Sequence, residues 1–254
     1  MTFGRFLTPI AVLLGLLVGL VSCTIPKQSE PVTVACAASV ADAIKALGET
    51  YSKQAGIDVV VVPGATGLLA RQLREGAPYD AFFSADEETV RTLVGEGLLS
   101  NESVREYARG EVVLAARPGG VFRADAEASL RDATALKIIA IPQPETAPYG
   151  RAAKAWLTSS KLEETLGSRL VISGDVGATM SLLKTGNADA AFVPRQLAEA
   201  AGFTTLSLPG AAPVVHLCAA SARGPRATEG AAFVAFCAGP AGAELLPGRT
   251  PAGD

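Results

Sequence analysis

The sequence has one histidine, four cysteines and no dense run of lysine and arginine among its 254 residues. No group of cysteines and histidines has the spacing of a metal site, so His216 is interpreted as a strand residue rather than a metal ligand. The net charge is −3, and no basic stripe with interleaved aromatic residues occurs, which argues against a nucleic-acid-binding protein. An anionic ligand must therefore be held without a surplus of positive side chains.

Long apolar runs are also missing, except at the N-terminus. Arg5 precedes an apolar run over residues 6–21, which is too short for a comfortable membrane span and is followed at once by a polar segment. This is the architecture of a secretion signal, which is removed from the mature protein. We therefore expect residues 1–22 to be a signal peptide.

The end of this run, Leu20-Val21-Ser22-Cys23, resembles the bacterial lipobox. The resemblance implies that the Cys23 thiol is acylated and that the chain is cut before it, so that 23–30 is a short tether. The protein would then lie in the cell envelope, in the periplasm or on the outer face of the plasma membrane, anchored by lipid. The alternative is ordinary cleavage, which leaves Cys23 as a spare thiol.

Three further cysteines remain, an odd number for an oxidising compartment. Cys36 lies in an apolar strand pattern, which is typical of a buried and inert thiol. Cys218 lies in a second strand pattern and Cys237 in a helical one. These two could form a disulfide, and their spacing alone leaves the question open.

The composition, 19% charged and 49% apolar, is that of an ordinary globular protein. Without the signal, roughly 225 residues remain, enough for two domains. Hydrophobic periodicity and turn residues predict alternating strands and helices. The strands are 32–37, 57–62, 81–83, 111–117, 137–141, 170–173, 190–193 and 214–220; the helices are 40–54, 68–75, 87–96, 149–158, 179–186 and 231–237. This order predicts an α/β protein with a parallel sheet and helical crossovers.

Four strand-to-helix junctions are the candidate binding places, because a small or hydroxyl residue opens a helix there. The first N–H groups of a helix have no partner within it, and the helix dipole adds partial positive charge. Ser39 opens the first helix, with Asp42 at the spacing of a capping box, and Thr66 opens the second between Gly64 and Gly67. The alternative for each hydroxyl is an ordinary N-cap that serves only its helix.

Several separated motifs carry a resemblance to the periplasmic molybdate-binding protein family. They are VACAAS at 34–39, GATGLLARQ at 64–72, GAPYDAFFSAD at 76–86, PQPETAPYGR at 142–151 and GDV at 174–176. The resemblance covers nearly all of the mature chain, and the motifs occur in the family's order and spacing. It implies a type II periplasmic-binding-protein fold, in which two α/β lobes enclose an oxyanion in the cleft between them.

The same resemblance implies the domain limits and the ligand contacts. Lobe one would comprise 31–109 with 213–254, and lobe two 110–212. The contacts fall on Ser39, Thr66, Tyr149 and Val176. Ser39 and Thr66 would donate hydrogen bonds from their hydroxyls and backbone N–H groups. Tyr149 and Val176 would donate from their backbone N–H groups, with the phenol of Tyr149 as an extra donor. Molybdenum would be bound as molybdate, through its oxygens, with no direct metal ligand and no cofactor.

Two positions depart from the family's pattern. Thr66 stands where many members have serine, and it keeps the hydroxyl. Pro194 stands where some members have tyrosine, and proline has neither a hydroxyl nor a backbone N–H, so a donor is lost there. Only Tyr149 could supply a replacement.

The chemistry of such a site favours a fully ionised tetrahedral dianion, which accepts hydrogen bonds and donates none. Phosphate near neutral pH carries a proton and needs an acceptor such as a carboxylate. Asp175 is the one carboxylate next to a predicted contact, and we interpret it as the cap of the helix that follows. Arg71, one turn past Thr66, is expected to pair with Asp80 or Asp86 rather than with the anion.

The sequence therefore predicts a lipid-anchored binding protein that captures molybdate or tungstate for an ABC-type importer, docks on a membrane permease and is a monomer. A binding protein for sulfate or phosphate is the alternative, because molybdate, tungstate and sulfate present the same charge and acceptor pattern and differ mainly in size. A secreted enzyme has less support. The sequence has no serine elbow, no metal cluster and no convincing pair of carboxylates in the candidate cleft.

Overall fold

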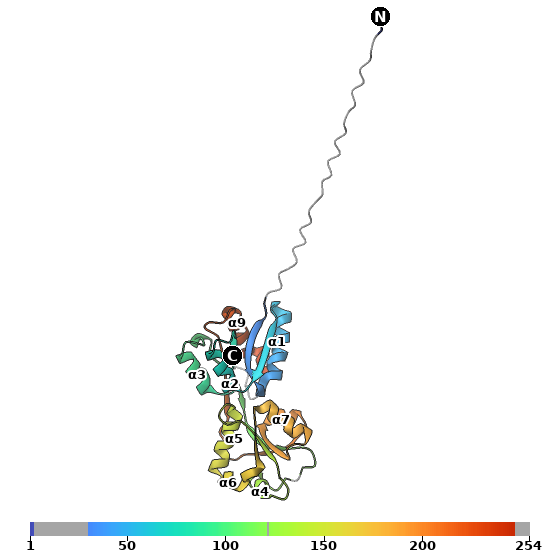
Figure 1. Cartoon of the computed structure of the whole chain (residues 1–254), viewed down its shortest axis with the longest axis vertical. Coiled ribbons are helices and arrows are strands. Elements are labelled where there is room, and N and C mark those ends of the chain that lie inside the picture. The colour runs from blue at the N-terminus through green and yellow to red at the C-terminus, as the bar shows by residue number, and fades with distance from the viewer. Residues whose placement is uncertain (3–29, 121, 247–254) are drawn as a thin grey trace.

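The computed structural model describes residues 1–2, 30–120 and 122–246. The expected signal peptide from residue 3 onward, Cys23, most of the tether and the tail from residue 247 lie outside the described residues. The described chain forms two five-stranded sheets with helices packed on both, and Figure 1 shows them as two lobes. No helix in the described part has the length and apolar character needed to cross a bilayer.

Lobe one contains the sheet with strand order β2-β1-β3-β10-β4. Its strands are β1 (Val32–Ala37), β2 (Val59–Gly64), β3 (Ala81–Phe83), β4 (Arg105–Gly110) and β10 (Val214–Ala220). Its helices are α1 (Ala41–Ala55), α2 (Thr66–Arg74), α3 (Glu87–Gly95), α9 (Ala227–Ala238) and α10 (Pro240–Leu245), with 3-10 turns η1 (Ala38–Val40) and η2 (Asn101–Ser103). Strands β1, β2 and β3 pair in parallel, and β10 runs antiparallel to its two neighbours.

Lobe two contains the sheet with strand order β7-β6-β8-β5-β9. Its strands are β5 (Val112–Ala116), β6 (Ile139–Pro142), β7 (Leu170–Ser173), β8 (Ala190–Pro194) and β9 (Thr204–Ser207). Its helices are α4 (Ala126–Arg131), α5 (Pro148–Ser159), α6 (Glu163–Leu166), α7 (Val176–Thr185) and α8 (Arg195–Ala200), with the 3-10 turn η3 (Gly167–Arg169). The chain passes between the lobes from β4 to β5 and again from β9 to β10.

The two-lobed α/β fold predicted from the sequence is confirmed, but the expectation of a parallel sheet is wrong in part. Each sheet is mixed, because β10 in lobe one and β5 in lobe two run antiparallel to their neighbours. The strands β4 and β9 were not predicted. Both lie at sheet edges, and β4 exposes charged residues such as Arg105 and Glu106, so neither shows the apolar pattern of a buried strand.

The position of helix α1 follows from its local sequence. Its apolar residues recur at helical spacing, so Ile44, Leu47 and Tyr51 are buried beneath the first sheet. The helix ends at Gly56, whose φ of 67° is a left-handed conformation that glycine adopts readily. Since the end of the helix is defined and one face is packed, its start is held at the carboxyl end of β1.

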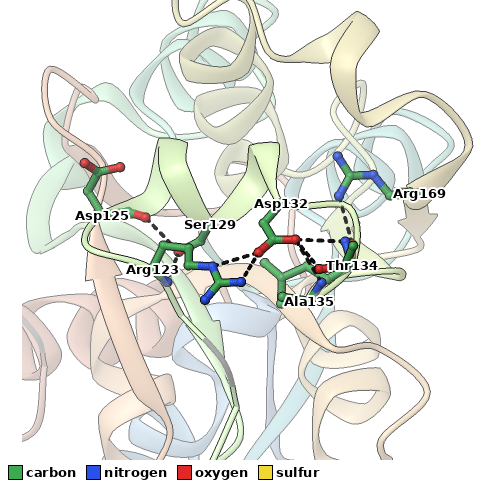
Figure 2. Close-up of polar contacts among 8 residues, drawn as sticks. Arg123, Asp125, Ser129, Asp132, Thr134, Ala135 and Arg169 are labelled. Atoms are coloured by element: carbon green, nitrogen blue, oxygen red, sulfur yellow. Dashed lines mark hydrogen bonds and ion pairs between the residues drawn. The ribbon is translucent and has the colours of Figure 1, made fainter.

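Lobe two has a polar cluster at α4 (Figure 2), at the end of the lobe remote from lobe one (Figure 1). Asp125 caps the helix by accepting from the Ala128 N–H at 2.8 Å. Asp132 accepts hydrogen bonds from the Thr134 N–H at 2.9 Å and from Arg123 Nε at 2.7 Å. The hydrogen bonds from Thr134, and to a smaller extent those from Arg123, lower the pKa of the Asp132 carboxyl. This cluster stabilises the lobe away from the cleft.

The three cysteines in the described part of the chain, Cys36, Cys218 and Cys237, are in the interior of lobe one. Cys36 on β1 and Cys218 on β10 are both buried and both lie in register with Phe83 on the strand between them. Cys218 donates its thiol proton to the Arg105 carbonyl oxygen at 3.6 Å. Cys218 and Cys237 are thiols in the structure rather than the two halves of a disulfide.

Candidate oxyanion site between the lobes

Four helix starts meet between the two lobes and enclose one cavity. They follow β1 and β2 in lobe one and β6 and β7 in lobe two, at the carboxyl ends of parallel strands. The cavity is lined by Ala37, Ala38, Ser39, Gly64, Ala65, Thr66, Ala85, Ala147, Pro148, Tyr149, Asp175 and Val176. All four residues predicted as ligand contacts are in this lining, although they come from segments far apart in the sequence.

The cavity is small, about 10 Å³ for the centre of a water-sized sphere. This suits one small group and not an organic molecule of drug size. Its lining contains no lysine, arginine or histidine. Among the described residues, no group of three or more histidine, cysteine and carboxylate side chains is placed to hold a metal ion. Positive potential in the cavity therefore comes from helix starts and N–H groups.

Ser39 does not cap a helix, so the interpretation of it as an ordinary N-cap is wrong. It lies inside η1, and neither η1 nor α1 has a side-chain cap. Asp42 lies 3.7 Å from Lys45 instead of forming a capping box. The side chain of Ser39 is buried, with 6% of the residue exposed, and its Oγ has no hydrogen-bond partner among the described residues. A buried hydroxyl without a partner is costly unless a ligand supplies one.

Thr66 is the first residue of α2, after the N-cap Ala65. Its side chain is almost fully buried, and its Oγ1 accepts a hydrogen bond from the Ala85 N–H at 3.2 Å. Since a hydroxyl has one proton to donate and two lone pairs, this bond leaves the proton available to an acceptor in the cavity. Thr66 thus joins the start of α2 to the loop that follows β3. That loop was recognised as a motif but not predicted to line the site.

Tyr149 is the second residue of α5, directly after Pro148 at the start of the helix. Its backbone N–H belongs to the first turn, where N–H groups have no intrahelical partner. Its ring is buried against His216 of β10, with ring centroids 5.7 Å apart, and burial raises the pKa of the phenol. The phenol oxygen reaches the crossing between the lobes, because a Cβ built on Gly110 would lie 1.7 Å from it.

Val176 and Asp175 begin α7. Asp175 is the N-cap, and its Oδ1 accepts from the Ala178 N–H at 2.8 Å, as predicted for a helix cap. Its carboxylate is therefore engaged by its own helix. Val176 is the first residue of the helix and is buried at the cavity, with its backbone N–H in the unpaired first turn.

Pro194 lies at the end of β8, opposite Val112 of β5, and is not part of the cavity lining. His216 is a strand residue, as predicted. It is fully buried on β10 with both ring nitrogens unpartnered among the described residues, stacks on Tyr107 at 5.6 Å between ring centroids, and burial lowers its pKa to about 3. The imidazole is therefore neutral and apolar in effect near pH 7.

The expected ion pairs of Arg71 with Asp80 or Asp86 are wrong. Arg71 donates from Nε to Glu75 at 2.8 Å on the exposed face of α2. Because the two residues are one helical turn apart, this pair forms locally. Asp80 instead accepts from the backbone N–H groups of Thr33 and Arg226, at 2.8 and 2.7 Å. The side chain of Arg71 is exposed and is not part of the cavity lining.

The fold and the cavity define a class: a two-lobed binding protein with a small cavity between its lobes. Residues 32–247 match the family of bacterial extracellular solute-binding proteins. The chain belongs to this family.

Its relatives and structural neighbours include binding proteins for oxyanions. The molybdate-binding protein ModA of Azotobacter vinelandii is 35% identical over 176 residues, which cover 69% of this chain and 68% of that protein. The structure of the periplasmic molybdate-binding protein of Azotobacter vinelandii matches with a TM-score of 0.74 and 28% identity, over 85% of this chain and 96% of that chain. The resemblance to molybdate-binding proteins seen in the sequence motifs is therefore confirmed.

A second structural neighbour shares the fold alone. The sulfate-binding protein SubI from Mycobacterium tuberculosis H37Rv matches with a TM-score of 0.73 and 15% identity, over 85% of this chain and 84% of that chain. The two TM-scores are nearly equal although the two proteins are named for different anions. The fold by itself therefore does not select the anion, and the choice must come from the cavity.

Proposed function

We propose that this protein is the extracytoplasmic binding protein of an ABC importer and that it captures molybdate or tungstate in the cavity between its lobes. The observation that carries the proposal is the unpartnered Oγ of Ser39, buried in a cavity that also receives the Thr66 hydroxyl and the first backbone N–H groups of α5 and α7. A tetrahedral dianion supplies the missing acceptor. Thr66, Tyr149 and Val176 are the other proposed contacts, and the molybdenum is held only through its oxygens.

The hydrogen-bonding state of the one carboxylate in the lining supports a fully ionised ligand. The one carboxylate in the lining, Asp175, is engaged by the Ala178 N–H. A protonated phosphate would need an acceptor, and the one carboxylate in the lining already caps its own helix, whereas molybdate, tungstate and sulfate need donors only. Molybdate and tungstate are preferred to sulfate on the family relationship, with size as the discriminating property.

The decisive experiment is thermal unfolding of the purified mature protein with molybdate, tungstate, sulfate or phosphate. A ligand at about a hundred times its Kd adds about 2.7 kcal/mol, which for a protein of this size raises Tm by roughly 5 to 10 °C. We expect this shift with molybdate and tungstate and a much smaller one with the other two anions. An equal shift with sulfate or phosphate would show that the assignment of the ligand is wrong.

The lipid anchor is a separate part of the proposal. It rests on the lipobox-like segment ending at Cys23, and we expect the acylated protein to remain with the membrane fraction and to deliver its ligand, as a monomer, to a membrane permease. Replacement Cys23→Ser should abolish labelling by a radioactive fatty acid. Equal labelling of the variant and the native protein would exclude Cys23 as the acylated residue.

A further inference from the structure

Two polar contacts join the lobes on one side of the cavity. Arg151 on α5 of lobe two donates from Nη2 to Oδ2 of Asp86 in lobe one at 3.0 Å. The Gly67 N–H on α2 of lobe one donates to the Thr146 carbonyl oxygen of lobe two at 2.9 Å. We call these two contacts the clasp.

The clasp is connected to the proposed ligand contacts in both lobes. Asp86 directly follows Ala85, whose N–H binds the Thr66 hydroxyl. Arg151 lies two residues after Tyr149 on the same helix. A closed ring of contacts therefore runs from the cavity through Thr66 to Asp86, across to Arg151 and back to the cavity.

The backbone contact of the clasp depends on a glycine. A Cβ built on Gly67 would lie 3.0 Å from the Thr146 Cα and 3.2 Å from its carbonyl oxygen. Both atoms belong to the backbone of the other lobe and cannot rotate away as a side chain would. Only a glycine at this position therefore lets the two backbones approach to hydrogen-bond distance without displacement.

The ionic contact is partly shielded from water. The side chain of Asp86 is 13% exposed and that of Arg151 47% exposed. Asp86 is also the N-cap of α3, where Oδ1 accepts from the Thr89 N–H at 2.8 Å, so the carboxylate is held in place for the arginine. The pair also balances charge, because an unpaired Asp86 carboxylate beside the cavity would repel a bound anion.

We propose that Arg151 and Asp86 are positioning residues that hold the lobes closed and thereby set the rate at which the ligand leaves. This rests on the proposed function for the ligand, but the clasp itself is a property of the protein. The contact forms only when the two lobes are together, so its loss raises the dissociation rate and changes the association rate little.

Charge balance decides which variant tests the proposal. Arg151→Gln alone leaves a negative charge near the anion, and Asp86→Asn alone leaves a positive one, so each single variant mixes two effects. The double variant R151Q/D86N removes the ion pair and keeps the local charge at zero. Asparagine is as good an N-cap as aspartate, so the start of α3 is retained.

We expect the double variant to release molybdate roughly 2- to 5-fold faster than the native protein, as for the loss of a partly exposed ion pair. Release is measured by chasing isotope-labelled molybdate with an excess of the unlabelled anion. Gly67→Ala should accelerate release as well. A double variant that releases molybdate at the native rate would overturn the proposal.

Two matched controls separate the clasp from general damage. Asp125→Asn makes the same change at the N-cap of α4, where the aspartate accepts an N–H at the same 2.8 Å, and α4 lies at the end of lobe two remote from lobe one (Figure 1). Arg74→Gln removes the ion pair with Glu96, at 2.8 Å, which lies within lobe one. We expect native release rates for both controls, and acceleration by either one equal to that of R151Q/D86N would contradict the proposal.

A measurement without ligand keeps this proposal separate from the proposed function. Spin labels on Lys53→Cys in lobe one and Glu164→Cys in lobe two, in a Cys23→Ser chain, report the distance between the lobes, since both positions are exposed and the described native cysteines are buried. We expect R151Q/D86N to shift the distribution to longer distances. If no anion raises the Tm of the protein, the proposed function is wrong. If the distance distribution of R151Q/D86N equals that of the native protein, the proposal that the clasp holds the lobes closed is wrong.

Discussion

Ser39→Ala is the sharpest test of the candidate site, because affinity and stability should respond in different ways. In the structure the Ser39 Oγ is buried and has no partner among the described residues, so the change to alanine removes no hydrogen bond within the protein. A conserved structural serine would behave differently, because its removal would break a bond. The variant therefore isolates a group whose partner is the ligand.

The expected magnitudes follow from hydrogen-bond energetics. A hydrogen bond to a charged group contributes about 1.5–3 kcal/mol, so the Kd for molybdate should rise roughly 10- to 150-fold. An unsatisfied buried hydroxyl costs free energy, so the unliganded variant should be as stable as the native protein or more stable by about 1 kcal/mol. The stability should be unchanged if water reaches the Ser39 hydroxyl when the lobes open, because the hydroxyl is then satisfied without the ligand.

The assays are isothermal titration with molybdate and urea unfolding without ligand. Ser129→Ala is the control, because this serine is also buried but its Oγ accepts from the Arg123 N–H at 2.8 Å and donates to the Asp125 carbonyl oxygen at 2.7 Å. The control should lose stability and keep its affinity. The reasoning is refuted if Ser39→Ala keeps native affinity, or if it loses more than about 1 kcal/mol of unliganded stability.

Three further predictions concern other residues. Thr66→Ala should destabilise the unliganded protein by about 1–3 kcal/mol because it leaves the Ala85 N–H unpaired, and should weaken anion binding, whereas Thr66→Ser should retain both in urea unfolding and titration. The native pKa of His216, about 3, lies below its unfolded value of about 6.5, so the unfolded chain binds the proton first as pH falls. The free energy of unfolding should therefore be full above pH 6.5 and should fall by about 2–3 kcal/mol by pH 4.5. His216→Phe should reduce this loss, as measured by unfolding curves above pH 6.5 and at pH 4.5. Arg71→Ala removes the exposed ion pair with Glu75 and should lower the free energy of unfolding slightly, while titration should give a Kd for molybdate within a few-fold of native. A large loss of affinity would show that Arg71 contributes to ligand binding.

Much of the fold could be predicted from local sequence patterns. The strands β1, β3, β7 and β10 have the predicted bounds, and α1, α5 and α9 lie within a few residues of prediction. These elements carry their own signal, since burial on one face or on both gives a periodic or continuous apolar pattern. The edge strands β4 and β9 do not, because they are paired on one side and carry polar residues.

The candidate site divides in the same way. Sequence motifs pointed to four of the residues that line the cavity, and Asp175 could be assigned as a cap because its partner lies three residues away. Arg71 was expected to pair with Asp80 or Asp86, whereas in the structure Asp86 pairs with Arg151, 65 residues away. No spacing rule predicts such a pair, because it depends on how two lobes close.

The sequence by itself determined the alternation of strands and helices, the family, and the hydroxyl and small residues at the helix starts. These properties follow from periodicity, backbone preferences and motifs within short segments. Only the tertiary structure decided that the sheets are mixed, that the Ser39 hydroxyl caps nothing, and that a clasp closes one side of the cavity. The physical reason is that whether a donor is satisfied depends on every group packed around it, and here those groups come from separate segments of the chain in two lobes.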